Sequence, residues 1–280
     1  MGRSERIKRA ARLVGEATKS VIADPKEAVG LLASRERERA HEFTRSWPVD
    51  NLTTTPVPAE ANPLLEYFEA NRTGPGIYKW RHYFEPYVRH LAKFVGKANT
   101  LVEIGVYSGG SLPMWRSYLG PDCHVHGIDI EPTCKVYETD GISIEIGDQG
   151  DRAFWADFRE RVPDVDIVID DGGHLPEQQI VTLEEMLPHL RPGGVLMIED
   201  IHGTSNHFTQ YALGLVDELN ECAEETPDIH GFVATPFQRA IHSIHFYPYL
   251  LVIEKHASCA PSQFEAPKHG TEWQPFLEPR

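Results

Sequence analysis

The residues best suited to chemistry in this sequence are carboxylates that follow short apolar stretches. The stretch VDIVIDDGGHL (165–175) runs directly into Asp170 and Asp171, two glycines and His174. Other apolar stretches also end in acids, namely Glu103, Asp129, Asp148 and the pair Glu199-Asp200. A single acid can simply cap a helix or occupy a turn. In an open parallel α/β sheet, however, ligands bind at the carboxyl ends of the strands, so these acids together predict one shared site.

The elements that position these acids follow from an alternation of short apolar runs and helical segments. Such alternation is typical of βαβ units and predicts an α/β fold with a parallel sheet. The expected strands are TLVEIG (100–105), CHVHGIDI (123–130), ISIEIGD (142–148), VDIVIDD (165–171) and GGVLMIED (193–200). The expected helices cover 111–119, 152–162, 176–190 and a segment around 208–223. Two β-rich runs around Tyr247-Pro248 predict a closing hairpin at a sheet edge.

The segment before residue 99 has a different character. Residues 1–46 look helical, and the Pro- and Thr-rich stretch 47–63 indicates a linker. We therefore expect a helical arm and linker (1–60), an aromatic cap or lid (61–98), a main domain (99–258) and a tail (259–280). Amphipathicity of the arm predicts homo-oligomerisation. The aromatic residues of the cap either close over a ligand or pack on the sheet, and these are Tyr78, Trp80, His82, Tyr83 and Phe84.

Composition excludes several classes of function. With 27 Lys and Arg against 42 Asp and Glu, the 280-residue chain carries a formal net charge of −15, which argues against a nucleic-acid partner and suits cationic ligands. No apolar run is long enough for a membrane span, and the N-terminus lacks the apolar core of a secretory signal. Four cysteines without a CxxC pair are typical of free thiols in a cytoplasmic protein, and these are Cys123, Cys134, Cys222 and Cys259.

The glycine loop after the first strand narrows the choice of ligand. Its spacing, Gly105-xxx-Gly109-Gly110, is not the GxGxxG of nicotinamide-binding folds, and no GKS or GKT follows as a P-loop requires. The acid at the loop entrance, Glu103, favours a ligand with a positive charge and no phosphate. Asp129, 20 residues beyond Gly109, is placed to accept hydrogen bonds from ribose hydroxyls.

Taken in order, the motifs EIGVYSGGS, GIDI, GD, IDDGGH and RPGGVLMIEDIH resemble those of class I S-adenosylmethionine-dependent methyltransferases. More closely, they are similar to the metal-dependent sugar O-methyltransferases that tailor macrolides such as mycinamicin and tylosin. The resemblance covers residues of about 75–256, including the closing hairpin. It implies a Rossmann-like, seven-stranded mixed sheet with an antiparallel last strand, here preceded by a helical N-terminal region.

The resemblance also implies roles for matching residues. The cofactor S-adenosylmethionine would contact Glu103, Gly105, Ser108 and Gly109 at its methionine end, Asp129 at the ribose, Asp148 at the adenine amine and Asp170 near the sulfonium or amino group. A divalent metal, expected to be Mg²⁺, would bind Asp171, Glu199 and Asp200. His174 would be the general base.

These groups suit the chemistry of methyl transfer to a hydroxyl. A sugar hydroxyl is a poor nucleophile; a bound divalent ion lowers its pKa, and a histidine can accept its proton. Oxygen ligands are what Mg²⁺ prefers. His202, three residues beyond Glu199, is an alternative base to His174, whereas we expect His245 to pair within the hairpin.

The sequence therefore predicts an S-adenosylmethionine- and Mg²⁺-dependent O-methyltransferase acting on a hydroxyl, on the sugar of a small glycosylated natural product. Two enzymatic alternatives stay open: a metal-independent small-molecule methyltransferase, and a tailoring enzyme like the cephalosporin hydroxylases, although non-haem iron would require two histidines and one carboxylate. A non-catalytic cofactor-binding partner protein is a third alternative. The sequence does not identify the acceptor or the hydroxyl.

Overall fold

The computed structural model describes residues 25–48, 61–202, 206–221, 224–226, 231–267 and 269–270. The chain divides into two compact units, one of residues 60–221 and 234–262 and the other of residues 1–59, 222–233 and 263–280. Predictions for residues 1–24 and for most of the linker therefore lie outside the described residues. In the second unit, helix α2 (Pro25–Arg45) confirms the helix expected before the linker. That unit also holds a small antiparallel sheet, in the order β10 (Gln263–Glu265), β7 (Gly231–Val233) and β6 (Glu224–Thr226).

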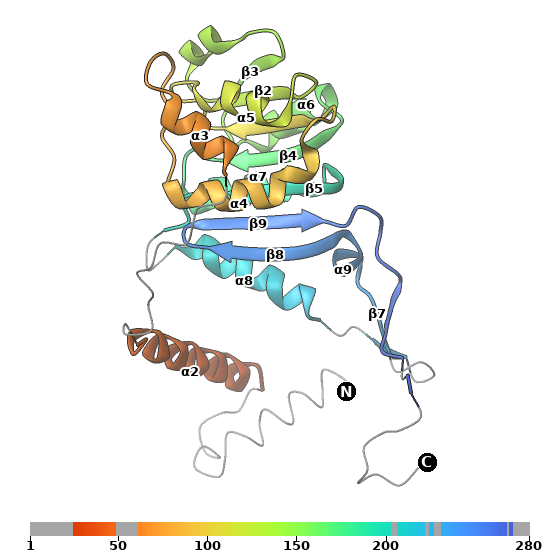
Figure 1. The fold of residues 1–280 in the computed structure, drawn as a ribbon. Helices are drawn as coiled ribbons and strands as arrows, with labels where there is room; N and C mark the ends of the chain where they lie inside the picture. Colours follow the sequence, from red (N-terminus) through yellow and green to blue (C-terminus); the bar gives the residue numbers. More distant parts are fainter. Residues whose placement is uncertain are drawn as a thin grey trace. The chain divides into compact units, whose positions relative to one another are not determined.

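Seven strands of the first unit form one mixed sheet in the order β3-β2-β1-β4-β5-β9-β8 (Figure 1). The five strands β1 to β5 run parallel, whereas β9 is antiparallel to both of its neighbours. The bounds are β1 Thr100–Ile104, β2 His124–Asp129, β3 Ile142–Ile146, β4 Val165–Asp170, β5 Leu190–Ile198, β8 Ile241–Tyr247 and β9 Leu250–Lys255. The predicted class I methyltransferase fold, its antiparallel last strand and the closing hairpin are confirmed.

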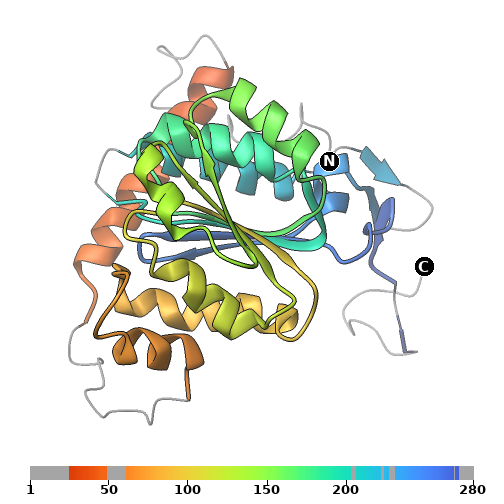
Figure 2. The same cartoon turned by 90° about the horizontal axis from the view of Figure 1, so that it is seen from above.

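Helices cover both faces of this sheet (Figure 2). One apolar cluster joins the sheet to α3 (Pro63–Ala70), α4 (Phe84–Leu91) and α5 (Ser111–Leu119). The other joins it to α6 (Arg152–Arg161), α7 (Pro176–Met186) and α8 (His207–Leu219). Neighbouring strand residues divide between the two clusters, as Leu101 and Val102 do, because successive side chains of a strand point to opposite faces. Both faces are covered, which explains why the central strands β1 and β4 are buried along almost their whole length.

Short connections complete the first unit. Two 3₁₀ turns, η3 (Arg81–Tyr83) and η4 (Ala92–Phe94), flank α4, and a third, η5 (Pro132–Tyr137), follows β2. A short helix, α9 (Pro236–Ala240), leads into β8. Among the residues that the structure describes, none of the helices has the length and apolarity needed to traverse a lipid bilayer.

The register of the central strands brings their carboxyl ends together. Ile104 at the end of β1 lies opposite Asp170 at the end of β4, and Asp170 lies opposite Ile198 at the end of β5. The chain after each strand therefore enters the same space. Gly105 permits the closest approach: its φ is +91°, and a side chain there would overlap the backbone carbonyl oxygen of Asp171.

We expect Gly105→Ala to lower the free energy of unfolding by at least about 1 kcal/mol, because alanine combines an unfavourable positive φ with this overlap. Gly214→Ala is the matched control. Gly214 lies inside α8 with open space around it, so alanine there is expected to stabilise the protein by about 0.5–1 kcal/mol. Urea unfolding of the three proteins measures both changes. Equal stability of Gly105→Ala and wild type would contradict the close approach of the two loops.

Candidate active site

A cavity of about 710 Å³ lies at the carboxyl ends of the parallel strands. Its volume is in the range of small-molecule and cofactor sites. Its wall is built from the loops that follow β1 to β5 and from residues 76–80, which precede η3. One end of the wall contains the glycine loop, and the other contains the acids after β4 and β5.

Most of the residues singled out by the sequence meet at this wall. Those that line it are Gly105, Ser108, Asp129, Asp148, Asp171, His174, Glu199 and Asp200. All the predicted residues belong to the described part of the chain. Three of them do not line the cavity: Glu103, Gly109 and Asp170. Convergence on one rim is thus observed, while the role of each residue stays a prediction.

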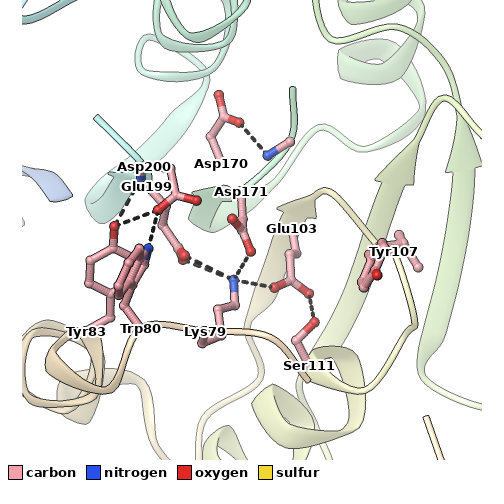
Figure 3. Close-up of polar contacts among 12 residues, drawn as sticks. Lys79, Trp80, Tyr83, Glu103, Tyr107, Ser111, Asp170, Asp171, Glu199 and Asp200 are labelled. Carbon is pink, nitrogen blue, oxygen red and sulfur yellow. Dashed lines mark hydrogen bonds and ion pairs between the residues drawn. The ribbon is translucent and has the colours of Figure 1, made fainter. Parts of the chain in front are cut away.

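Lys79 is the centre of the polar contacts at this rim (Figure 3). Its side chain is only 2% exposed, and its Nζ lies 2.7 Å from Asp171 Oδ2, 3.1 Å from Glu199 Oε1 and 3.2 Å from Glu103 Oε1. Burial alone would lower the pKa of Lys79, but the attraction of the three carboxylates outweighs it and holds this pKa well above its usual value. Lys79 therefore carries a charged ammonium group at neutral pH.

The cluster around Lys79 contains more acidic than basic side chains. Burial raises the pKa of Glu199; Asp171 and Glu103 add to this rise, while Lys79 opposes it. Tyr87, from α4, donates a hydrogen bond of 2.7 Å to Glu199 Oε1 and holds that carboxylate from the other side. One ammonium group thus faces three carboxyl groups, an arrangement that leaves favourable electrostatics for a further cation.

Asp200 is held by the aromatic residues of the cap. Trp80 Nε1 and the Tyr83 hydroxyl donate to Asp200 Oδ1 at 2.8 and 2.9 Å, and the same hydroxyl lies 3.0 Å from the backbone carbonyl of Tyr249. The backbone of Asp200 has a φ of +58°, a conformation that costs a non-glycine residue about 1–3 kcal/mol. The surrounding contacts must compensate for this strain, and they fix the direction of the carboxylate.

His174 faces the other oxygen of Asp200. Its Nε2 lies 3.5 Å from Asp200 Oδ2, and its backbone is also left-handed, with a φ of +54°. One donor atom each from Asp171, His174 and Asp200 lie within 4.8 Å of one another. The two carboxylates fit the preference of a hard divalent ion for oxygen. Glu199 is not in this group, because Lys79 and Tyr87 hold its carboxylate.

Asp170 does not line the cavity, and its role near the cofactor stays a prediction. Its side chain is fully buried, accepts 3.0 Å and 3.2 Å hydrogen bonds from Gln149 Nε2 and the Gly172 amide, and lies behind the wall. Burial raises its pKa, although the hydrogen bonds oppose this. Asp170 therefore shapes the loop that carries Asp171 and His174, and direct contact with a ligand is not favoured by this geometry.

Glu103 is likewise fully buried. It accepts a 2.6 Å hydrogen bond from Ser111 Oγ at the start of α5 and pairs with Lys79. These contacts connect β1, α5 and the cap, and the contact of Glu103 with the cofactor stays a prediction. Gly109 lies directly against the Tyr137 ring, which leaves no space for a side chain.

Asp129 points toward the glycine loop, as predicted. Its Oδ2 accepts hydrogen bonds of 2.9 and 3.0 Å from the amides of Val106 and Tyr107, and Oδ1 accepts one from the Glu131 amide. Asp129 therefore fixes the loop after β1 while lining the cavity. Asp148 also lines it, with Oδ1 bonded to the Gly150 amide.

The aromatic cap contains both buried and exposed residues, and its closure over a ligand stays a prediction. Tyr83 and Phe84 are buried in the apolar cluster, whereas Tyr78 and Trp80 are exposed and line the cavity. His202, the alternative base, is not among the described residues that line the cavity. Its ring packs against Tyr249.

Sequence analysis missed Lys79, Tyr87 and Gln149, which organise the buried side of this site. A signal for Lys79 was present, because several acids predicted at one rim require a counter-charge. Lys79 lies within the aromatic segment IYKWRHYF that had been assigned to the cap. Nothing in the local pattern distinguishes Gln149 from a surface glutamine.

Comparisons with known proteins relate this chain to methyltransferases. Residues 102–201 match the family model described as a methyltransferase domain. The chain is 33% identical over 204 residues to the 8-demethyl-8-alpha-L-rhamnosyl tetracenomycin-C 2'-O-methyltransferase of Streptomyces olivaceus, covering 65% of this chain and 53% of that protein. It is 37% identical to the mycinamicin VI 2''-O-methyltransferase of Micromonospora griseorubida, covering 62% and 48%. The chain thus spans about half the length of these curated relatives.

Among solved structures, the chain resembles the MycE methyltransferase of mycinamycin biosynthesis in complex with Mg and SAH. The TM-score is 0.57 at 25% identity, over 71% of this chain and 55% of that one. A second structure of MycE, with Mg, SAH and mycinamycin VI, matches with a TM-score of 0.55 at 27% identity, over 69% and 52%. The sheet thus has the class I methyltransferase fold, residues 102–201 are similar to methyltransferase domains, and the chain is similar to O-methyltransferases named for rhamnosyl tetracenomycin-C and mycinamicin VI.

Proposed function

We propose that this chain is an S-adenosylmethionine- and Mg²⁺-dependent O-methyltransferase that acts on a sugar hydroxyl of a small glycosylated natural product. One observation carries the proposal: Asp171, His174 and Asp200 converge within 4.8 Å on the wall of a cavity that also reaches Asp129 and the glycine loop. Relatives named for methylation of rhamnosyl and macrolide sugars support the substrate class.

The chain's own residues have distinct tasks in this proposal. The glycine loop with Ser108 receives the methionine end of the cofactor, Asp129 the ribose hydroxyls and Asp148 the adenine amine. Trp80 and Tyr78 form the part of the wall that shields the reacting groups from water. When bound, S-adenosylmethionine supplies an electrophilic methyl group and a divalent ion lowers the pKa of the acceptor hydroxyl.

Asp171, Glu199 and Asp200 would hold the ion. Lys79 already contacts Asp171 and Glu199, and Tyr87 also donates to Glu199 Oε1. A carboxylate oxygen has two lone pairs, so Asp171 and Glu199 Oε2 can serve the ammonium and an ion together. His174 would take the acceptor's proton at Nε2, the atom that faces Asp200. The position of His174 at the wall, which His202 does not share, supports this choice of base.

This donor group also weighs against the oxygenase alternative. A non-haem iron centre of the common type uses two histidines and one carboxylate, whereas this cavity combines one histidine with carboxylates. The predicted homo-oligomer and cytoplasmic location stay predictions. Light scattering of the purified chain tests the oligomer, and a monomer would remove it.

Two measurements test the proposed function. Calorimetry should detect binding of S-adenosylhomocysteine, and mass spectrometry should detect addition of one methyl group to a member of a panel of rhamnosylated and macrolide acceptors. We expect transfer to stop when EDTA removes the metal and to resume with Mg²⁺. Cofactor binding without transfer to any acceptor would support the non-catalytic alternative, and transfer unaffected by EDTA would support a metal-independent enzyme.

A further inference from the structure

A second cluster of metal-binding side chains lies outside the cavity wall. His90 comes from α4, His245 from the edge strand β8 and Glu254 from β9. One donor atom from each lies within 4.8 Å of donors of the other two, although the three residues are far apart in the sequence. The fold, and not local sequence, therefore creates this group.

The two imidazoles are close to each other and to the carboxylate. The His90 and His245 ring centroids are 4.7 Å apart, and His90 Nδ1 lies 3.2 Å from Glu254 Oε1. Each ring uses one nitrogen for a hydroxyl: His90 Nε2 lies 3.0 Å from the Tyr247 hydroxyl, and His245 Nε2 lies 2.9 Å from Ser243 Oγ. Metal-binding histidines commonly have such a partner on one nitrogen, which orients the ring.

Lys93 provides the positive charge that now faces Glu254. Its Nζ lies 3.0 Å from Glu254 Oε1, but its side chain is 42% exposed. The ammonium group can therefore withdraw into solvent, unlike that of the buried Lys79. His242, also exposed, approaches the other oxygen of Glu254 at 4.0 Å.

We propose that His90, His245 and Glu254 form a binding site for a divalent transition-metal ion, Zn²⁺ or an ion of similar preference, which joins α4 to the β8-β9 hairpin. Two imidazoles and a carboxylate are a known zinc donor set, and imidazole favours such ions over Mg²⁺. The all-oxygen preference of Mg²⁺ keeps the two sites chemically distinct. Because α4 also carries Tyr87, the ion would fix the helix that holds Glu199.

Cobalt(II) is the probe, because four-coordinate Co²⁺ absorbs visible light much more strongly than the six-coordinate ion. The full-length chain, with any affinity tag removed, is titrated with Co²⁺ in excess Mg²⁺, which saturates oxygen-only sites. We expect one equivalent of Co²⁺ to bind and to produce intense visible absorption bands. These bands should disappear when added Zn²⁺ displaces the Co²⁺. Titration without such bands would overturn the proposal.

Variants locate the bound ion. His245→Ala and Glu254→Gln are expected to weaken Co²⁺ binding at least tenfold, whereas Lys93→Met, which keeps all three donors, should tighten it. The matched control is His124→Ala. His124 also contacts a serine hydroxyl, and its ring centroid lies 4.6 Å from that of another imidazole, His126. Unchanged binding in His245→Ala would refute the assignment.

Stability supplies a second readout. Zn²⁺ should raise the thermal midpoint of the wild type and of His124→Ala by several degrees, but not that of His245→Ala. Circular dichroism confirms that each variant is folded. If Asp200→Asn abolishes the Co²⁺ bands while His245→Ala retains them, the ion binds in the cavity and the second site is disproved.

Discussion

Replacing His174 with alanine is expected to lower the rate of methyl transfer by about 10²–10⁴-fold, the usual contribution of a general base. The change removes the imidazole whose Nε2 faces Asp200 and leaves the glycine loop and Asp129 untouched. Binding of S-adenosylhomocysteine should therefore stay at the wild-type affinity. Single-turnover rates with a saturating acceptor, together with calorimetry, separate the two effects.

His202→Ala is the matched control for this experiment. The His202 ring packs against Tyr249 and is exposed, so its loss should change the rate less than tenfold. The reverse result, with a large loss in His202→Ala and a small one in His174→Ala, would transfer the role of base to His202. Full activity in both variants would remove a histidine base from the mechanism.

Replacing Lys79 with methionine is expected to lower the free energy of unfolding by about 3–5 kcal/mol at neutral pH. Methionine has a similar length, so the main loss is the ammonium group that now contacts Glu103, Asp171 and Glu199. Removing one partner of a buried ion pair leaves the remaining charge uncompensated. Urea unfolding measures the change, and Lys135→Met, which removes an exposed pair with Glu138, should change stability little.

The loss in Lys79→Met should depend on pH in a defined direction. In the wild type, the raised pKa of Lys79 means that its contribution is complete below the ordinary lysine pKa of 10.5 and is lost only at higher pH. In the variant, the pKa of Glu199, already raised by burial, should rise further because Lys79 no longer opposes the rise. Stability from such groups is present at low pH and is lost as pH rises through the raised values, so the variant should be closer to wild type at about pH 5 than at about pH 8. The opposite trend would show that the carboxylates stay ionised without Lys79.

Local sequence patterns predicted the parallel sheet and the closing hairpin of the first unit, whereas its seven strands and antiparallel last strand were implied by the family resemblance. Apolar runs such as VDIVID gave the strands, and their alternation with helical segments required parallel connections and hence a common rim. The small sheet of β6, β7 and β10 was not predicted, because three-residue strands such as Gln263–Glu265 are too short for an alternating pattern.

The site was only partly predictable, for a physical reason. Acids at strand ends are recognisable because the sheet itself brings them together. Lys79, in contrast, is 92 residues from Asp171 and 120 from Glu199, and its burial depends on how the cap packs on the sheet. The different surroundings of Asp170 and Asp171 were equally hard to predict: the two are adjacent in sequence, but the strand turns one inward to Gln149 and the other toward the cavity.

The contacts of the aromatic cap limit how such enzymes can be re-engineered. Trp80 and Tyr83 bond to Asp200, and Tyr83 also reaches the backbone of Tyr249, so the short segment before α4 is tied to both the end of β5 and the hairpin turn. Replacing residues 76–83 alone with a segment from another protein would leave Asp200, the Tyr249 carbonyl and the buried carboxylates without these hydrogen-bond and ion-pair partners. A functional chimera must instead exchange the cap and the hairpin turn as a single block.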